Sequence, residues 1–363
     1  MTIGAPTLFA QAAYHGPAIS LTKVADGVYA TAFDNRTDAA MNGNGVVIVN
    51  ASDVLVVDTQ DTPEAARSVI SEIRKITSNP VRYVINTHFH GDHHFGNQVY
   101  RDSFPGVEFI SHPYTREDIY KEEIPALRAY ADSGLENETL GLERALATGK
   151  APDGSPISAA YRSSVGARIS QNRWWLSQLR AVQPVPAGLT VADSLVLIRG
   201  ERTIVVRFLG RGNTRGDLTV WLPRERVLIT GDLLVNPMPY GFGSFLGDWI
   251  RVLDQLRALP ARAIVPGHGV IQHDFAYLDL VKALLESTLS QARAAVAKGL
   301  DLQGTRKAVN LDSFRLRFTG GNPALVPVFD GNYTIPAVER AWMEARGAAP
   351  FIPTTTRPNP SLK

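Results

Sequence analysis

Half of the histidines of this chain stand within seven residues, and this cluster limits the folds that the chain can adopt. Four of eight histidines occur in the segment His88-Phe89-His90-Gly91-Asp92-His93-His94, directly after the apolar run Val81–Asn86. Imidazole nitrogens suit zinc and iron, and the carboxylate of Asp92 adds a hard oxygen ligand. In extended chain His88 and His90 point the same way, and Gly91 permits a turn that directs Asp92 and His93 elsewhere. The cluster therefore predicts a centre for one or two metals; a loop of solvated histidines is the alternative.

Two later segments resemble the rest of such a centre. Thr230-Gly231-Asp232 ends one apolar run, and Pro266-Gly267-His268-Gly269 ends another. Each segment alone is a weak signal, because Gly-Asp turns and loop histidines are common. Three apolar runs that each end in a ligand type make a stronger joint case, and they require a fold that brings the three ends together.

The pattern of apolar residues predicts two blocks of strands around a helical middle. The sequence predicts strands over Val28–Phe33, Gly45–Val49, Val54–Asp58, Val81–Asn86, Val107–Ser111, Leu189–Leu209, Leu218–Leu222, Val227–Thr230 and Ala263–Val265. Thr62-Pro63-Glu64 predicts a helix start, and further helices are expected around Trp249–Leu259, Phe275–Val296 and Ala337–Arg346. Strands that alternate with helices indicate a layered α/β protein, although periodicity does not distinguish one sheet from two.

Composition excludes several classes of site and partner. The chain has no cysteine, so it has no disulfide, no thiolate ligand and no cysteine nucleophile. Net charge is +2 without a basic run, and no run of apolar residues is long enough for a membrane span. We therefore expect a small-molecule substrate, no nucleic acid and no membrane. Oligomeric state stays open, as does the compartment, cytoplasmic or periplasmic after removal of a signal peptide.

The motifs together resemble those of the metallo-β-lactamase superfamily. Thr87–His94 matches the signature of that family, and Val57-Asp58-Thr59 is similar to its early aspartate motif. Gly231-Asp232 resembles the bridging aspartate, and Pro266–Gly269 resembles the last histidine motif. The resemblance extends from about Val28 to about His273. It implies a four-layer αββα sandwich with the metal centre at one edge, between the two sheets.

The resemblance also implies a set of ligands. Residue by residue, it assigns His88 and His90 to a first metal, Asp92, His93 and His268 to a second, and Asp232 to a bridge between them. Asp92, His93 and Asp232 are then the expected catalytic residues. Asp58 resembles the outer carboxylate that orders the histidine loop, and His112 would have an outer role at most. His94 has no assigned ligand role, and His15 and His273 are expected at the surface.

One position departs from the family pattern. The family usually has a further histidine ligand to the first metal, and this chain has Asn213 in the segment Gly212-Asn213-Thr214. An asparagine carbonyl oxygen is a weaker zinc ligand than imidazole. We therefore expect a first site that is weak, binds through water or is empty, beside a complete second site. One or two zinc ions are predicted, with iron or manganese as alternatives.

The family further implies a hydrolase that uses metal-activated water, because zinc lowers the pKa of bound water to about 7. Expected substrates are esters, lactones, thioesters or phosphoesters. A β-lactamase is the first alternative, although the lactamase subclasses that require a cysteine are excluded. A non-haem iron oxidoreductase is the second. Residues 1–299 are expected to form the main domain, with a helical insertion at about 114–182, and residues 300–363 a helical extension. Trp174, Trp175 and Tyr161 would either line a pocket or pack the insertion onto the core.

Overall fold

Twelve strands form two sheets in the computed structural model, which describes residues 16, 18–33, 42–151 and 154–347. The seven-stranded sheet has the order β1 to β7, formed by Ile19–Ala25, Val28–Phe33, Val46–Val49, Val54–Val57, Val81–Ile85, Glu108–Ser111 and Leu189–Thr190. The five-stranded sheet has the order β12-β11-β10-β9-β8, with β8 Ser194–Arg199, β9 Arg202–Phe208, β10 Leu218–Leu222, β11 Val227–Val235 and β12 Ala263–His268. Two sheets settle the question that periodicity left open.

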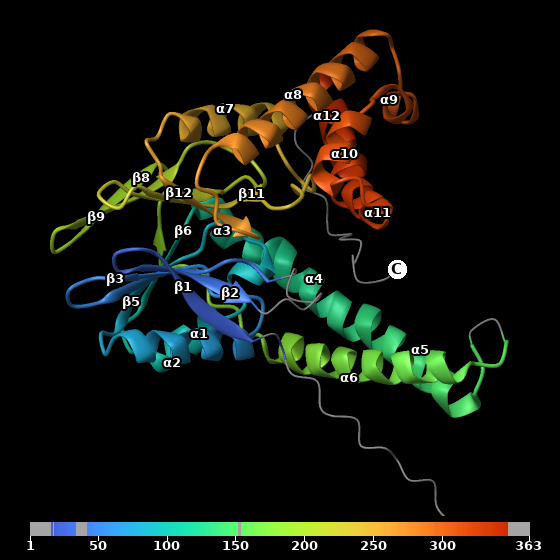
Figure 1. Ribbon diagram of the computed structural model, residues 1–363, viewed down its shortest axis with the longest axis horizontal. Coiled ribbons are helices and arrows are strands. Elements are labelled where there is room, and N and C mark those ends of the chain that lie inside the picture. The colour runs from blue at the N-terminus through green and yellow to red at the C-terminus, as the bar shows by residue number, and fades with distance from the viewer. Residues whose placement is uncertain (1–15, 17, 34–41, 152–153, 348–363) are drawn as a thin grey trace, which may run out of the picture.

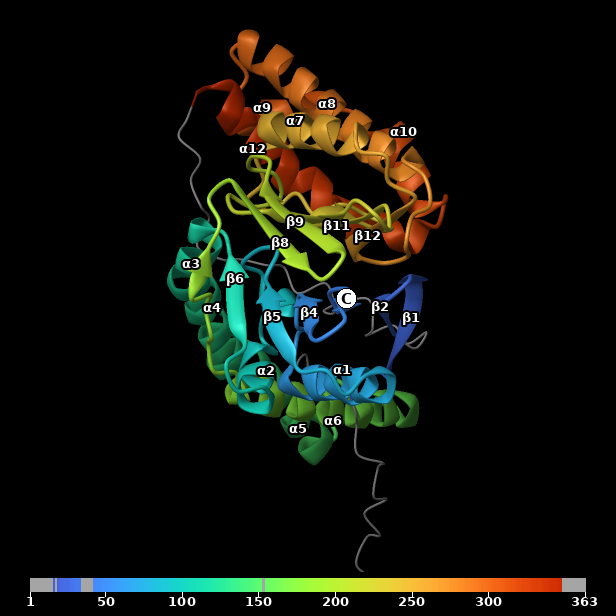
Figure 2. The same ribbon diagram turned by 90° about the vertical axis from the view of Figure 1, so that its left-hand side faces the viewer.

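The two sheets pack face to face through buried aliphatic side chains. Val46, Leu55 and Ile85 of one sheet share a core cluster with Ile204 and Val220 of the other, and all five are fully buried. Helices α1 (Pro63–Ile76) and α2 (Asn97–Ser103) cover the outer face of the seven-stranded sheet, and α7 (Leu246–Arg257) and α8 (Ala276–Ala297) cover the five-stranded sheet (Figures 1 and 2). The expected four-layer αββα sandwich is therefore confirmed.

Local chemistry explains where α1 begins. Thr62 has extended backbone, and its hydroxyl accepts a hydrogen bond from Ala65 N at 3.1 Å. Pro63 occupies the first helical position, where its missing N–H costs nothing. The buried residues of α1 include Ala66, Val69, Ile70 and Ile73, which pack against strands of the seven-stranded sheet. The predicted start of this helix is confirmed.

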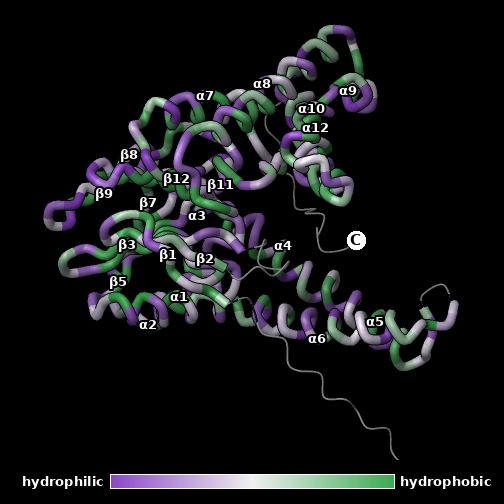
Figure 3. The backbone as a smooth tube through the Cα atoms, viewed as in Figure 1, coloured by the Kyte–Doolittle hydropathy of each residue, from purple (hydrophilic) through white to green (hydrophobic). Residues whose placement is uncertain are grey.

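The helical middle forms an arm that leaves the sandwich (Figure 1). Its first half is a nearly continuous helix built from α3 (Pro113–Asp118), η3 (Ile119–Glu123), α4 (Ile124–Ala129), η4 (Tyr130–Leu135) and α5 (Glu136–Thr148), in which η3 and η4 are π-helical. The chain then returns along α6 (Ala159–Ala181). Arg173 of α6 pairs with Glu136 and Glu143 of α5, both at 2.8 Å. Hydrophobic residues concentrate in the strands, whereas hydrophobic and hydrophilic residues alternate along the arm (Figure 3).

The C-terminal region is more helical than the sequence predicted. Helix α12 (Ile335–Ala345) confirms the expected helix, but α9 (Leu302–Ala308), α10 (Asp312–Thr319), α11 (Val326–Phe329), η5 (Pro323–Leu325) and η6 (Asp330–Thr334) precede it. Phe318, Phe329 and Tyr333 of these short elements join the core of α7 and α8. Such short helices offer too few turns for a periodic signal. Helix α2 was missed for the same reason, whereas strand β1 was missed because none of its seven residues is fully buried and it contains no apolar run. Residues 348–363 lie outside the described residues.

No helix in the described part of the chain is both long enough and apolar enough to cross a membrane.

Candidate metal centre

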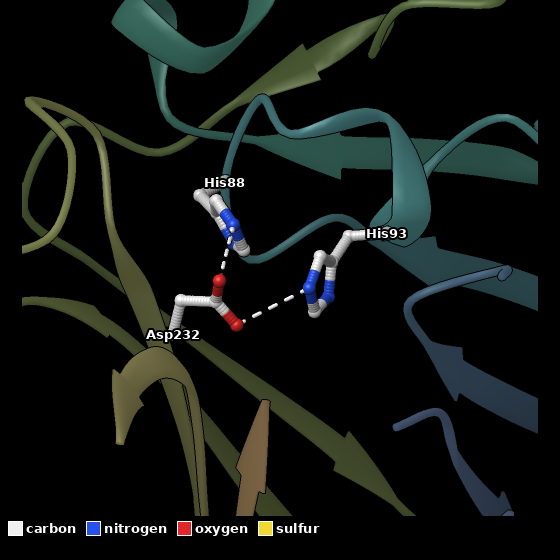
Figure 4. Close-up of side chains that lie close together, drawn as sticks. All are labelled: His88, His93 and Asp232. Carbon is white, nitrogen blue, oxygen red and sulfur yellow. Dashed lines mark ion pairs between the residues drawn. The ribbon is translucent and has the colours of Figure 1, made fainter. Parts of the chain in front are cut away.

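Three segments from both sheets supply the candidate ligands, and Figure 4 shows His88 and His93 of the histidine loop facing Asp232. The histidine loop follows β5, Asp232 lies on β11, and His268 is the last residue of β12. The sequence placed Asp232 after a strand; in the structure β11 continues past it to Val235, because a register shift at Gly231 bends the strand without ending it. Gly231 has a φ of +52°, and a Cβ there would lie 2.6 Å from Thr87 Oγ1. Glycine thus lets β11 approach the histidine loop closely.

Two overlapping groups of side chains have ligand atoms close enough to hold a metal ion. The first is His88, His93 and Asp232, and the second is Asp92, His93 and His268. Asp232 Oδ2 lies 3.5 Å from His88 Nε2, and Asp232 Oδ1 lies 3.2 Å from His93 Nε2. Asp92 Oδ2 lies 2.9 Å from His268 Nε2 and 3.3 Å from His93 Nε2. Within the described residues these are the groups of this kind, and His93 belongs to both.

The contacts between imidazoles fit a cation. His88 Nε2 faces His90 Nδ1 at 3.0 Å, and His93 Nε2 faces His268 Nε2 at 3.4 Å. Asp232 Oδ1 is buried and has no hydrogen-bond partner among the described atoms. Nitrogen lone pairs and a carboxylate oxygen that converge in this way form the donor set that zinc prefers. The residues therefore fit the metal that the sequence predicted.

The electrostatics of the centre favour ionised carboxylates and a protonated His93. Burial raises the pKa of Asp92 and of Asp232, but the neighbouring His93 and His268 lower both pKa values further, to well below the ordinary range. Burial lowers the pKa of His93, and the carboxylates of Asp92, Asp232 and Asp58 more than offset this, so that the pKa lies well above its ordinary value. An incoming metal ion thus has to displace a proton from His93.

Asp58 orients the histidine loop through three hydrogen bonds. Its Oδ1 accepts from Thr87 N at 2.8 Å, and its Oδ2 accepts from Thr87 Oγ1 at 2.7 Å and faces His93 Nδ1 at 2.9 Å. When Asp58 accepts a hydrogen bond from His93 Nδ1–H, the Nε2 lone pair is left toward the candidate metal position. An outer carboxylate of the kind that the family resemblance implied would make such contacts.

Asn213 lies in a tightly bonded loop beside the centre. Its Nδ2 donates to the carbonyl oxygen of Tyr240 at 2.9 Å, while its Oδ1 is buried without a hydrogen-bond partner among the described atoms. Asp217 fixes the loop, because its Oδ2 accepts from Gly212 N at 3.1 Å and Thr214 N at 2.8 Å. The amide is thus oriented with its oxygen available as a weak ligand or acceptor. No motif in the sequence singles out Asp217.

The other histidines lie outside the two ligand groups, and His90, a predicted ligand, is among them, although its Nδ1 lies 3.7 Å from Asp232 Oδ2. His94 is buried, contacts the carbonyl oxygen of Phe89 through Nε2 at 2.9 Å, and burial lowers its pKa to about 3. His112 accepts from Tyr114 N at 3.1 Å and so caps α3, and burial together with Arg215 lowers its pKa to about 4. His273 is exposed as expected, and His15 lies outside the described residues. One acid was missed: burial and the nearby Asp92 raise the pKa of Asp61 to about 7.

Partly exposed aromatic rings border the centre on two sides. The Phe89 ring lies 4.7 Å from the His90 ring, and the Tyr240 ring lies 5.5 Å from the His268 ring, as measured between centroids. Phe242 adjoins Tyr240 at 5.7 Å. Trp174 Nε1 instead donates a hydrogen bond to Glu64 Oε2 of α1 at 3.0 Å, and Trp175 packs on the core of the arm. These contacts favour the packing interpretation of both tryptophans. Tyr161, at the start of α6, is 37% exposed.

Comparisons with known proteins agree with this geometry. The family model described as the metallo-beta-lactamase superfamily matches residues 39–268. A linear primary-alkylsulfatase of Pseudomonas sp. (strain ATCC 19151) is 27% identical over 225 residues, which cover 60% of this chain but only 39% of that protein. A metallo-beta-lactamase type 2 of Bacteroides fragilis is 31% identical over 118 residues, 29% of this chain and 45% of that one. The chain thus matches less than half of the length of these two relatives.

Solved structures show the same fold. The sec-alkylsulfatase Pisa1 from Pseudomonas sp. superimposes with a TM-score of 0.63 at 14% identity, over 90% of this chain and 50% of that one. A metallo-beta-lactamase from Pontibacter korlensis has a TM-score of 0.50 at 18% identity, over 74% of this chain and 99% of that one.

Proposed function

The chain belongs to the metallo-β-lactamase superfamily of hydrolases, and on that premise we propose that it cleaves an ester-type bond of a small molecule with the help of zinc. The observation that carries the proposal is the placement of His93, whose Nε2 lies 3.3 Å from Asp92 Oδ2 and 3.2 Å from Asp232 Oδ1. One imidazole thus joins the two candidate ligand groups, and Asp58 fixes its tautomer. A cluster of buried acids and imidazoles with a purely structural role would not need the Nε2 lone pair of His93 to be directed toward the other candidate ligands.

Zinc bound here would supply a water of lowered pKa and would polarise the substrate oxygen. Asp92, His93, Asp232 and His268 would hold the tighter ion, while His88, His90 and the Asn213 oxygen would form the weaker position. The Asp92 side chain is 15% exposed, compared with 4% or less for His93, His268 and Asp232. Asp92 is therefore placed to accept a hydrogen bond from the attacking water and to orient it.

The rings near the centre suit a substrate with an apolar part. The Phe89 ring lies next to His90 and the Tyr240 ring lies next to His268, and both rings are partly exposed. Such rings would contact the alkyl or aryl group of an ester while the ester itself meets the ligands. Lactones, thioesters and phosphoesters with apolar groups are the candidate substrates, and the alkylsulfatase relative adds alkyl sulfates.

β-Lactam hydrolysis is the second candidate, because two relatives carry the name metallo-beta-lactamase type 2. Because the chain has no cysteine and has Asn213 in place of a histidine, we rank β-lactam hydrolysis below ester hydrolysis as a candidate activity.

A substrate panel tests the proposal. Purified protein loaded with zinc, manganese or iron would be assayed with short- and long-chain lactones, thioesters, phosphodiesters, alkyl sulfates and a chromogenic β-lactam, beside Asp92→Ala as the inactive control. We expect turnover of one of the ester classes that requires metal and Asp92. Hydrolysis of the β-lactam alone would select the second candidate. Oxygen consumption by the iron form without any hydrolysis would refute the proposal.

A further inference from the structure

The insertion meets the metal-binding loop at Gly91. Gly91 N donates a hydrogen bond to Glu123 Oε1 at 2.9 Å, and Glu123 is 6% exposed. Glu123 closes the π-helical turn η3, and such turns are rare and often occur at functional sites. The next two residues of the loop, Asp92 and His93, are candidate ligands. A carboxylate from a different part of the chain therefore holds the backbone one residue before them.

The fit between loop and insertion is close. A Cβ on residue 91 would lie 2.6 Å from Glu123 Oε1 and 2.0 Å from the Phe95 ring, so that glycine alone fits there. Phe95 itself belongs to the core of the insertion, together with Leu127, Ala131, Leu135, Leu176, Leu179 and Val182. The loop thus directs His88, His90, Asp92 and His93 to the centre and Gly91 and Phe95 to the insertion.

The same stretch of the insertion also holds the loop that contains Asn213. Thr115 Oγ1 donates to the carbonyl oxygen of Gly216 at 2.8 Å. Arg215 Nε donates to Asp118 Oδ2 at 2.8 Å, and the Asp118 side chain is only 2% exposed. The segment from Thr115 to Glu123 therefore binds both loops that border the first ligand group, whereas α5 and α6 extend away from the centre (Figure 1).

We propose that Glu123 is a positioning residue of the metal centre, which fixes the backbone at Gly91 and thereby the places of Asp92 and His93. The hydrogen bond is charge-assisted and buried, and both properties strengthen it. The inference rests on the proposed function only in that a metal binds here, because it concerns the affinity for that metal and not the reaction. The base of the insertion is accordingly a support for the centre.

Zinc binding tests the role of Glu123 independently of any substrate. The full chain and its Glu123→Ala and Glu123→Gln variants would be titrated with zinc against a chromophoric chelator, with cobalt spectra and hydrogen exchange of the Gly91 amide as further measurements. Loss of an outer partner typically weakens metal binding by about 10- to 100-fold, which we expect for alanine. Glutamine keeps an acceptor oxygen but not the charge, so we expect a loss of roughly 2- to 10-fold.

Glu143→Gln is the control, because Glu143 is likewise a glutamate of the insertion with a bonded partner, but that partner, Arg173, lies in the arm and not in the metal-binding loop. It should leave zinc affinity and the cobalt spectrum unchanged. A folded Glu123→Ala protein with unchanged zinc affinity and cobalt spectrum would overturn the proposal. If alanine prevents folding, unchanged affinity in Glu123→Gln would overturn it. Failure of the unmodified chain to bind zinc would instead refute the proposed function.

Discussion

Replacing Asp58 with asparagine should weaken metal binding as well as the fold. The carboxylate accepts from Thr87 N at 2.8 Å and Thr87 Oγ1 at 2.7 Å and faces His93 Nδ1 at 2.9 Å. Asparagine has the same shape and can keep the bond to Thr87 N. Its amide group would meet His93 Nδ1 with a donor in place of an acceptor. The imidazole would then no longer be held with Nδ1 protonated and Nε2 free for metal.

The size of the effect follows from these contacts. Loss of the outer partner of a metal-ligating histidine typically costs about 10- to 100-fold in affinity, or roughly 1.4–2.7 kcal/mol. The fold loses a hydrogen bond to a charged group, which is worth about 1.5–3 kcal/mol. Both losses are visible in one protein only if the variant stays folded, and the retained Thr87 contact favours that.

Asp53→Asn provides a control of matched burial. Asp53 is 1% exposed, accepts from Asn50 Nδ2 at 2.8 Å and pairs with Arg199, at the opposite end of β4 from Asp58. Zinc titration against a chelator and thermal melts of the metal-free proteins would be made for both variants. We expect lower melting temperatures in both, but weaker zinc binding in Asp58→Asn alone. Equal zinc affinity in Asp58→Asn and the unmodified chain would refute the reasoning.

Four other perturbations test the ligand assignment, the Asn213 position, the protonation of His93 and the packing of the arm. Asp232→Ala should lose bound metal and activity, whereas His94→Ala should keep most of both, because His94 contacts Phe89 O and no candidate ligand; equal damage would contradict the assignment. Asn213→His should raise zinc stoichiometry toward two per chain in a chelator titration, unless the unmodified chain already holds two ions tightly. Zinc affinity should fall as pH falls, with proton release in weakly buffered solution, because carboxylates raise the pKa of His93 and its protonated form must lose that proton; affinity independent of pH would show otherwise. Trp175→Ala should lower stability by at most about 3–5 kcal/mol in a thermal melt and leave substrate preference unchanged, whereas a changed preference at an unchanged melting temperature would favour the pocket interpretation.

The sequence was sufficient for the centre of the fold because its signals there are local. Thr62 and Pro63 specify a helix start through capping and backbone geometry alone, and apolar runs such as Val81–Ile85 mark buried strands. The order of the motifs then implied the αββα sandwich. Short elements such as α11 (Val326–Phe329) depend on long-range packing, so no local pattern predicts them. Strand β7 (Leu189–Thr190), by contrast, lies inside the predicted strand range Leu189–Leu209.

The residues that support the centre were harder to predict than the candidate ligands. His88 and His90 are recognisable because unusual residue types stand together, whereas Glu123 is one acid among many in a helical segment. Its role depends on a turn that brings Oε1 to Gly91 N, a contact across 32 positions of the chain. The sequence predicted Asp232 at a strand end, whereas β11 continues to Val235, because a bulge at Gly231 leaves no separate signal in the residues that follow.

The two ligand groups are supported unequally, and this bears on how many ions the centre holds. His93 and Asp92 are fixed from two sides, by Asp58 through His93 Nδ1 and by Glu123 through Gly91 N. At the first metal position, Thr87 Oγ1 lies within hydrogen-bond distance of His88 Nδ1, at 2.9 Å. Asn213, however, offers only a neutral oxygen there, where the family usually has an imidazole. Preorganised and charged ligands bind zinc more tightly than a neutral amide oxygen does. A centre that fills its second position first, and its first position only at higher zinc concentration, is the arrangement that these contacts favour.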